Sequence, residues 1–260
     1  MNQLHEQIRS ETNPEINRLL SIAHKLYPSL KGQIGDHQVG GIRFGQNNNA
    51  SITKLYHCME TRHPEASQPY WSIRTWTLLV WQPIYLALIG VHQLNIMPPL
   101  DNISQIQADG NVAGFYIQDH AYHRSHDNDL IKTTAQLLKQ VCDALFEELS
   151  RITRIRRISA MRLVADTLLA ALNRLQYSNT QLTNKQIINL ADLWLSAMDL
   201  EGQSHFMPIT LSSGREQLVL NRKGCCMHYR RQNGDLCASC PKQKMPIRVE
   251  RLSAAYNTSN

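Results

Sequence analysis

The sequence lacks the motifs that identify several large classes of enzyme. It has no G-x-G-x-x-G fingerprint for NAD or FAD. Its Gly40-Gly41 pair and its Asn47–Asn49 run are not followed by the G-K-[ST] of a phosphate-binding loop. No internal repeat or clear linker interrupts the 260 residues. We therefore do not expect the chain to draw electrons directly from a nicotinamide cofactor.

Long apolar runs and an export signal are also missing. Residues 69–92 are the most apolar part, but they contain Arg74, Gln82 and Pro83, and their uninterrupted portion is too short for a membrane span. We expect a buried core helix that is kinked at Pro83. The segment Met1–Ser10 is polar and has no apolar core of a signal peptide, which favours a cytoplasmic protein. Peripheral contact with the inner membrane face stays open.

Cysteine is sparse, at six residues in the chain, but it is concentrated near one end. In a chain without an export signal, we expect reduced thiols rather than disulfides. The spacing of four of them is C-C-x10-C-x2-C, and four thiolates in so short a segment are typical of a metal site. These four are Cys225, Cys226, Cys237 and Cys240.

The spacing bears on which metal is bound. Cys237 and Cys240 form an ordinary C-x2-C turn, which directs two sulfurs at one ion. Cys225 and Cys226 are adjacent, so in an extended segment their side chains point apart and chelate a single tetrahedral ion poorly. A [2Fe–2S] cluster offers two neighbouring irons, so adjacent sulfurs need not share an ion. The spacing favours this cluster and does not exclude zinc.

A C-C-x10-C-x2-C motif near the C-terminus resembles that of the FhuF-like ferric siderophore reductase family. The resemblance implies a [2Fe–2S] cluster bound by Cys225, Cys226, Cys237 and Cys240. It also implies one-electron reduction of Fe(III) in hydroxamate-type siderophores, with release of Fe(II) for iron acquisition. The motif is short, but its adjacent cysteines make it more discriminating than a single C-x2-C. The tail after Cys240 is longer than this resemblance leads us to expect.

Positive charge is concentrated around the same cysteines. Residues 222–251 contain eight Lys or Arg and two acidic residues, so this segment alone accounts for the net charge of +6. Such a basic segment attracts an acidic partner or an anionic substrate, and it raises the reduction potential of a cluster. We predict that Lys223, Arg230 and Arg231 help to dock the siderophore or an external electron donor. The donor we expect is a ferredoxin or an NAD(P)H-dependent reductase.

Two other functions remain open from the sequence. A zinc knuckle with basic surroundings could bind nucleic acid, but adjacent cysteines and the lack of stacking aromatics other than Tyr229 argue against it. The arginine-rich segment 151–157 also has no interleaved aromatics, which favours a solvated corner between helices. A [2Fe–2S] cluster that only senses redox state or iron would use the same ligands, so the sequence cannot separate it from an enzyme.

Hydrophobic periodicity predicts a mainly α (α+β) protein with a small antiparallel β element, to which the resemblance adds a C-terminal iron–sulfur module. Residues 28–50 read as a loop, and 103–117 as a hairpin around Asp109-Gly110. We expect a siderophore-binding body over 1–203, a cluster module over 204–252 and a disordered tail over 253–260. Helices are predicted at 2–26 (divided at Pro14), 51–62, 69–92, 127–153, 158–175 and 184–200, with a second hairpin from 206–211 and 217–220.

Three further groups of side chains have both a structural and a functional interpretation. His120, His123 and His126 could bind a metal, although their spacing matches no standard zinc pattern and a polar loop is favoured. The tryptophans of 69–92 could form a platform for an iron chelate, but core packing is favoured. Cys142 lies on the apolar face of its helix, which indicates a small buried hydrophobic residue.

Overall fold

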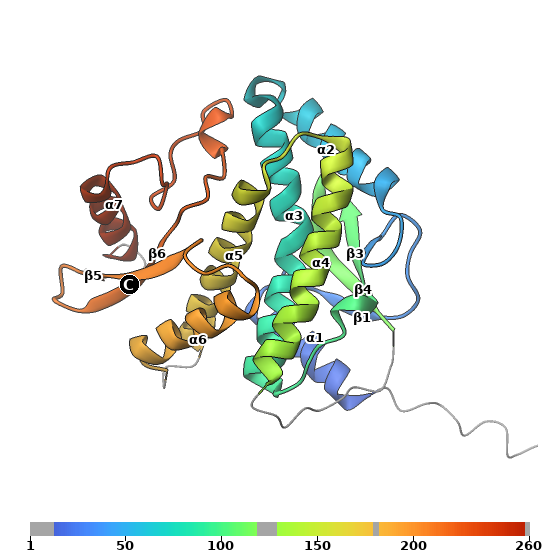
Figure 1. Cartoon of the computed structure of the whole chain (residues 1–260), viewed down its shortest axis with the longest axis horizontal. Coiled ribbons are helices and arrows are strands. Elements are labelled where there is room, and N and C mark those ends of the chain that lie inside the picture. The colour runs from blue at the N-terminus through green and yellow to red at the C-terminus, as the bar shows by residue number, and fades with distance from the viewer. Residues whose placement is uncertain (1–12, 119–128, 179–181, 258–260) are drawn as a thin grey trace, which may run out of the picture.

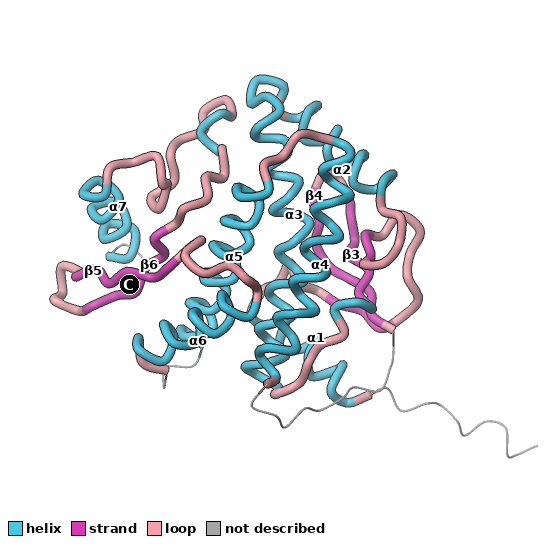
Figure 2. Tube along the Cα trace, in the orientation of Figure 1, coloured by secondary structure: helices cyan, strands magenta, loops and turns pink. Residues whose placement is uncertain are grey.

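The computed structural model describes residues 13–118, 129–178 and 182–257. In this part of the chain the protein is mainly helical, with two small sheets (Figures 1 and 2), which confirms the predicted fold class. The helices are α1 Pro14–Leu26, α2 Asn49–Arg62, α3 Ser67–Ile89, α4 Leu130–Ile152, α5 Arg157–Ser178, α6 Asn184–Ala197 and α7 Met245–Asn257. The strands are β1 Gly32–Ile34, β2 Ile42–Arg43, β3 Ile103–Ala108, β4 Asn111–Ile117, β5 His205–Thr210 and β6 Glu216–Asn221.

Helix α3 is the centre of the fold and contacts α1, α2, α4 and α5. In Figure 1 it lies between α5 and the four-stranded sheet, with α4 beside it. Trp76 is fully buried, and its indole Nε1 donates to the carbonyl of Ala160 on α5 (2.8 Å). The helix over Pro64–Leu94 is long and apolar enough to cross a membrane by length and composition alone, but 67% of its most apolar window is buried inside the protein. Core packing is therefore the role of Trp76, and α3 continues through Pro83.

The four-stranded sheet has the order β1-β4-β3-β2. Strands β3 and β4 form the predicted hairpin, and Asp109 and Gly110 both have the positive φ that its turn requires. The expectation of a loop over 28–50 is wrong in part, because β1 and β2 lie there and β1 pairs in parallel with β4. Strands of two or three residues are too short to show alternation in a sequence, so their pairing depends on tertiary contacts.

Strands β5 and β6 form the second predicted hairpin, with α7 packed against β5. In Figure 2 this hairpin and α7 lie on the far side of α5 from the larger sheet. Ile209, Leu211, Val219 and Leu252 form a small core that is separate from the main one, and a boundary near residue 204 stays a prediction. The prediction of a disordered tail is wrong for 253–257, because α7 continues to Asn257 and buries Leu252 against the hairpin.

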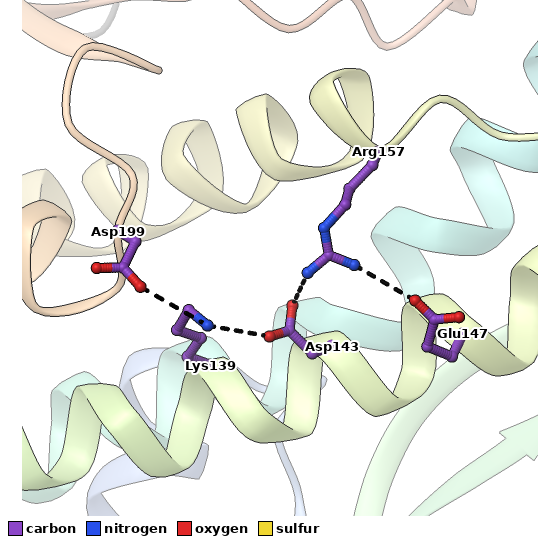
Figure 3. A network of polar contacts seen from close by, with 5 residues as sticks. All are labelled: Lys139, Asp143, Glu147, Arg157 and Asp199. Carbon is purple, nitrogen blue, oxygen red and sulfur yellow. Dashed lines mark hydrogen bonds and ion pairs between the residues drawn. The ribbon is translucent and has the colours of Figure 1, made fainter.

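Helices α4 and α5 meet at the predicted arginine-rich corner, where 153–156 leave helical geometry. Close to this corner, Arg157 pairs with Asp143 and Glu147, and Lys139 bridges Asp143 to Asp199 (Figure 3). These charged side chains are partly exposed, so each pair contributes little to stability. Deeper in α4, Cys142 is buried among apolar residues, as its position on the helix predicts.

A buried histidine makes stability depend on pH. The indole Nε1 of Trp194 donates to Nε2 of His92 (2.9 Å), and burial lowers the pKa of His92 to about 4. The unfolded chain binds a proton at this residue below a pH of about 6.5, whereas the folded chain does not. The contribution of neutral His92 to folding stability is therefore complete above that pH, and it is lost as the pH falls toward 4.

We expect His92 to remove about 2 kcal/mol of folding stability between pH 7.5 and pH 5. His92→Gln keeps an acceptor for Trp194 but cannot titrate. Urea unfolding at several pH values should show a shallower acid dependence for this variant than for the natural chain. Parallel curves for the two proteins would show that His92 does not carry the effect.

Candidate metal centre

The hairpin β5–β6 delivers the chain to the cysteine segment, which folds back on itself through three tight turns. Met227 adopts a left-handed conformation (φ 57°) directly after the cysteine pair, and a short 3₁₀ turn follows at His228–Arg230. Asn233 is also left-handed (φ 59°), and the amide of Gly234 donates to the carbonyl of Arg231 (2.8 Å). The Asn-Gly turn predicted in the ten-residue spacer is thus present, and it returns the chain toward Cys225.

The third turn closes the C-x2-C pair, and each of its two cysteines interacts with one cysteine of the first pair. The amide of Cys240 donates to the carbonyl of Cys237 (2.9 Å). Across the two arms, the thiol of Cys237 donates to Cys226, and the thiol of Cys225 donates to Cys240. Cys240 is buried, whereas the other three are partly exposed. The sulfurs are therefore arranged as two pairs, each with one member from each arm.

This arrangement fits a [2Fe–2S] cluster. Each iron of such a cluster takes two thiolates, so two adjoining pairs of cysteines are the donor set that it requires. Within the described residues, no group of three or more His, Cys, Asp or Glu side chains is placed to hold one metal ion. The two pairs nevertheless supply four thiolates, the number that a [2Fe–2S] cluster takes.

The pKa values of Cys225, Cys226 and Cys237 are shifted in different directions. The hydrogen bond from Cys237 is the main cause that lowers the pKa of Cys226 to about 5, with the positive charge of Arg222 as a smaller one. The same hydrogen bond, together with burial, raises the pKa of Cys237. Burial is the main cause that raises the pKa of Cys225. Cys226 is therefore a thiolate at neutral pH, and a thiolate is the form that ligates metal.

A buried carboxylate fastens the cysteine segment to the helical body. Asp166 on α5 accepts hydrogen bonds from the hydroxyl of Ser204 (2.7 Å) and from the amide of Gly224 (3.0 Å). It also pairs with Nε of Arg222 (3.2 Å), whose Nη1 lies 3.9 Å from the sulfur of Cys237. Burial raises the pKa of Asp166, and Arg222 opposes that shift. One side chain therefore holds both ends of the hairpin and orients a cation toward a cysteine sulfur.

Gly224 is required at this anchor because of its close contact with α5. A Cβ at this position would lie 2.8 Å from Oδ2 of Asp166 and 3.0 Å from a methyl carbon of Leu163. The residue before the cysteine pair thus has to be small for the segment to reach the helix.

A cavity of about 420 Å³ opens beside the sulfurs of Cys226 and Cys237. It lies between the cysteine segment and the helical body, and it is bordered by the end of α2, by α3 and by the turn between β3 and β4. Its lining side chains are polar or cationic for the most part, with no acidic residue among them. The residues that line it are Met59, Arg62, His63, Tyr70, Arg74, Thr77, Gly110, Cys226, His228, Arg231 and Cys237.

The three basic residues predicted to dock substrate or donor lie in different surroundings. Arg231 borders the cavity. Arg230 donates to the carbonyl of Ala66 (2.9 Å) and to the hydroxyl of Ser67 (2.6 Å), which ties the segment to α3. The ammonium of Lys223 donates to the carbonyl of Gly202. Of these three residues, Arg231 alone borders the cavity, and the docking role of all three stays a prediction.

Sequence reasoning missed the residues that the helical body contributes to the site. Asp166, Arg62 and Arg74 lie far from the cysteines in sequence and match no motif. The one available signal was Asp166, which is an acidic residue among apolar neighbours in a strongly apolar helix. The candidate ligands His120, His123 and His126 lie outside the described residues.

Comparison with known protein families agrees with this geometry. Residues 222–242 match the family model of the FhuF 2Fe-2S C-terminal domain. The match contains all four cysteines of the motif and begins at Arg222. It confirms the resemblance and the [2Fe–2S] cofactor, and it relates the chain to siderophore-iron reductases. The match covers the cysteine segment and not the helical body.

Proposed function

We propose that this chain, with its FhuF-type 2Fe-2S domain, is a cytoplasmic ferric siderophore reductase whose cluster is held by Cys225, Cys226, Cys237 and Cys240. The observation that carries the proposal is the cavity, because two of the four cysteine sulfurs border it. A chelate in that cavity would lie next to the ligands through which an electron leaves. The family resemblance adds the hydroxamate type of siderophore.

When it is bound, the cluster supplies one-electron transfer. The chain has three tasks around it. Cys226 provides a thiolate at neutral pH, Arg222 places positive charge near Cys237, and Asp166 fixes both by holding the segment on α5. Positive charge beside a cluster ligand raises the reduction potential, since reduction adds negative charge. The substrate Fe(III) is held tightly by siderophore oxygens, so its reduction weakens the complex and favours release of Fe(II).

The electron comes from a separate protein under this proposal. The sequence has no dinucleotide fingerprint. The basic cysteine segment offers a positive surface that suits an acidic partner such as a ferredoxin, and an NAD(P)H-dependent reductase can serve in its place.

We expect the dithionite-reduced protein to reduce a ferric hydroxamate in a single turnover under anaerobic conditions, when it is given an anionic, a neutral and a cationic chelate in turn. A ferrous-specific chromogenic chelator in the same cuvette would record the Fe(II) released. The protein with NADPH and no other protein should give no reduction above buffer. If oxygen reoxidises the reduced cluster but no ferric chelate does, the reductase function is excluded. The cluster would then have the sensing role.

A further inference from the structure

Three arginines gather at the cavity beside Cys226 and Cys237, and the carboxylate of Glu65 lies near one of them, Arg231. Arg62, Arg74 and Arg231 all border the cavity. None of the three forms an ion pair with an acidic side chain in the described part of the chain. Other arginines in the protein do form such pairs, as Arg157 does with Asp143 and Arg222 with Asp166.

A second observation shows that the three charges converge. His63 lies in the same cavity, and the pKa of its imidazole is lowered by burial and then by the charges of Arg231, Arg62 and Arg74, against the opposing charge of Glu65. In addition, Nε of Arg231 is buried and has no hydrogen-bond partner within the described residues. A buried donor without a partner is costly, so a ligand that accepts from it gains affinity.

The positive charges of the three arginines matter because the cysteines hold a cluster that is negatively charged. A cluster with four thiolate ligands is itself negative, so it repels an anion that approaches its exposed sulfurs. A neutral ferric trihydroxamate would need no cations to come close. An anionic chelate would need them, and guanidinium groups bind carboxylates through paired hydrogen bonds.

We propose that this cavity selects ferric chelates of net negative charge, whose free carboxylates pair with Arg62, Arg74 and Arg231. The inference rests on the proposed reductase function and narrows its substrate class. It is compatible with the hydroxamate type, because hydroxamate siderophores can carry further carboxylates on their arms, which stay free when the hydroxamates and a central hydroxycarboxylate bind the iron. The preferred substrate is thus a carboxylate-bearing ferric hydroxamate rather than a neutral or cationic one.

The test separates binding from electron transfer. Gallium(III) has the charge of Fe(III) and is not reduced, so gallium chelates report affinity alone. Three probes would be titrated into the cluster-loaded protein by calorimetry: a citrate dihydroxamate (anionic), ferrichrome (neutral) and ferrioxamine B (cationic), each loaded with gallium. We expect the anionic chelate to bind at least roughly tenfold more tightly than the other two, with an advantage that declines as salt rises.

Arg74→Gln is the informative variant, because Arg74 is an exposed residue of α3 and makes no described side-chain hydrogen bond. It should weaken binding of the anionic chelate by roughly tenfold and leave the neutral one unchanged. Arg215→Gln removes the same charge from the turn between β5 and β6, away from the cavity, and should change neither. The reduction potential of Arg74→Gln would be measured in parallel.

Each outcome bears on a separate claim. Equal affinity for the three gallium chelates, or equal weakening of all by Arg74→Gln, would overturn the charge selection. A shift of the cluster potential in Arg74→Gln without any change in binding would assign the arginines to the cluster instead, and would overturn it too. Failure of the reduced protein to reduce any ferric chelate would refute the reductase function, whichever chelate binds best.

Discussion

Cys226→Ser should purify without the red-brown colour of a [2Fe–2S] protein and should reduce no ferric chelate. Cys226 is the cysteine whose pKa is lowered, to about 5, and it borders the cavity. A serine hydroxyl is not ionised at neutral pH and is a poor replacement for a thiolate. Loss of one ligand from a pair leaves one iron without its donor set. The measurements are the visible absorption spectrum, the iron content and the rate of Fe(II) release.

The matched control is Cys58→Ser. Cys58 is on α2 and is a partly exposed cysteine that does not belong to the motif. This variant should retain colour, iron and activity. A coloured and active Cys226→Ser protein would refute the ligand assignment, and loss of colour in both variants would point to a general effect of removing cysteine.

Asp166→Asn should be the most destabilising change of a single charge in the described part of the chain. Asp166 is 3% exposed and holds Ser204, Arg222 and Gly224. Asparagine keeps an acceptor oxygen but removes the charge, so the half-buried guanidinium of Arg222 loses its counter-ion. Removal of one partner from a buried ion pair costs about 3–5 kcal/mol. Because the same carboxylate orients the cysteine segment, the variant should also lose much of its cluster.

Asp143→Asn is the control for this prediction. Asp143 also pairs with an arginine, but in the partly exposed network of Figure 3. Its removal should cost less than about 1 kcal/mol and leave the cluster in place. Urea unfolding and iron content of both variants would be compared under reducing conditions. Similar costs for the two variants would show that the Asp166 contacts are not the anchor described here.

Local patterns were sufficient to predict most of the fold. Helix α4 was expected over 127–153 and runs over Leu130–Ile152, because its apolar face repeats at helical spacing. The hairpin of β3 and β4 follows from Asp109-Gly110. The parallel pairing of β1 with β4 could not be predicted, since Gly32–Ile34 is too short to show a pattern. The end of α7 was missed because its polar residues resemble a solvated tail, although Leu252 is buried in the hairpin core and Val249 and Tyr256 pack against that core.

The residues of the candidate site also fall into those that the sequence predicts and those that it does not. Cysteine spacing is a local property, so Cys225, Cys226, Cys237 and Cys240 were predictable as a group. The pairing of Cys226 with Cys237 depends on turns at Met227 and Asn233, of which only the second has a sequence signal. Asp166, Arg62 and Arg74 reach the site through the packing of α2, α3 and α5. Contacts of this kind arise from tertiary structure, and one sequence does not show them.

The most direct measurement is the metal and sulfide content of the protein purified without oxygen, together with the EPR spectrum of its dithionite-reduced form. The account predicts two irons and two acid-labile sulfides per chain, with an EPR signal that appears on reduction. One zinc per chain with no labile sulfide and no EPR signal would contradict it.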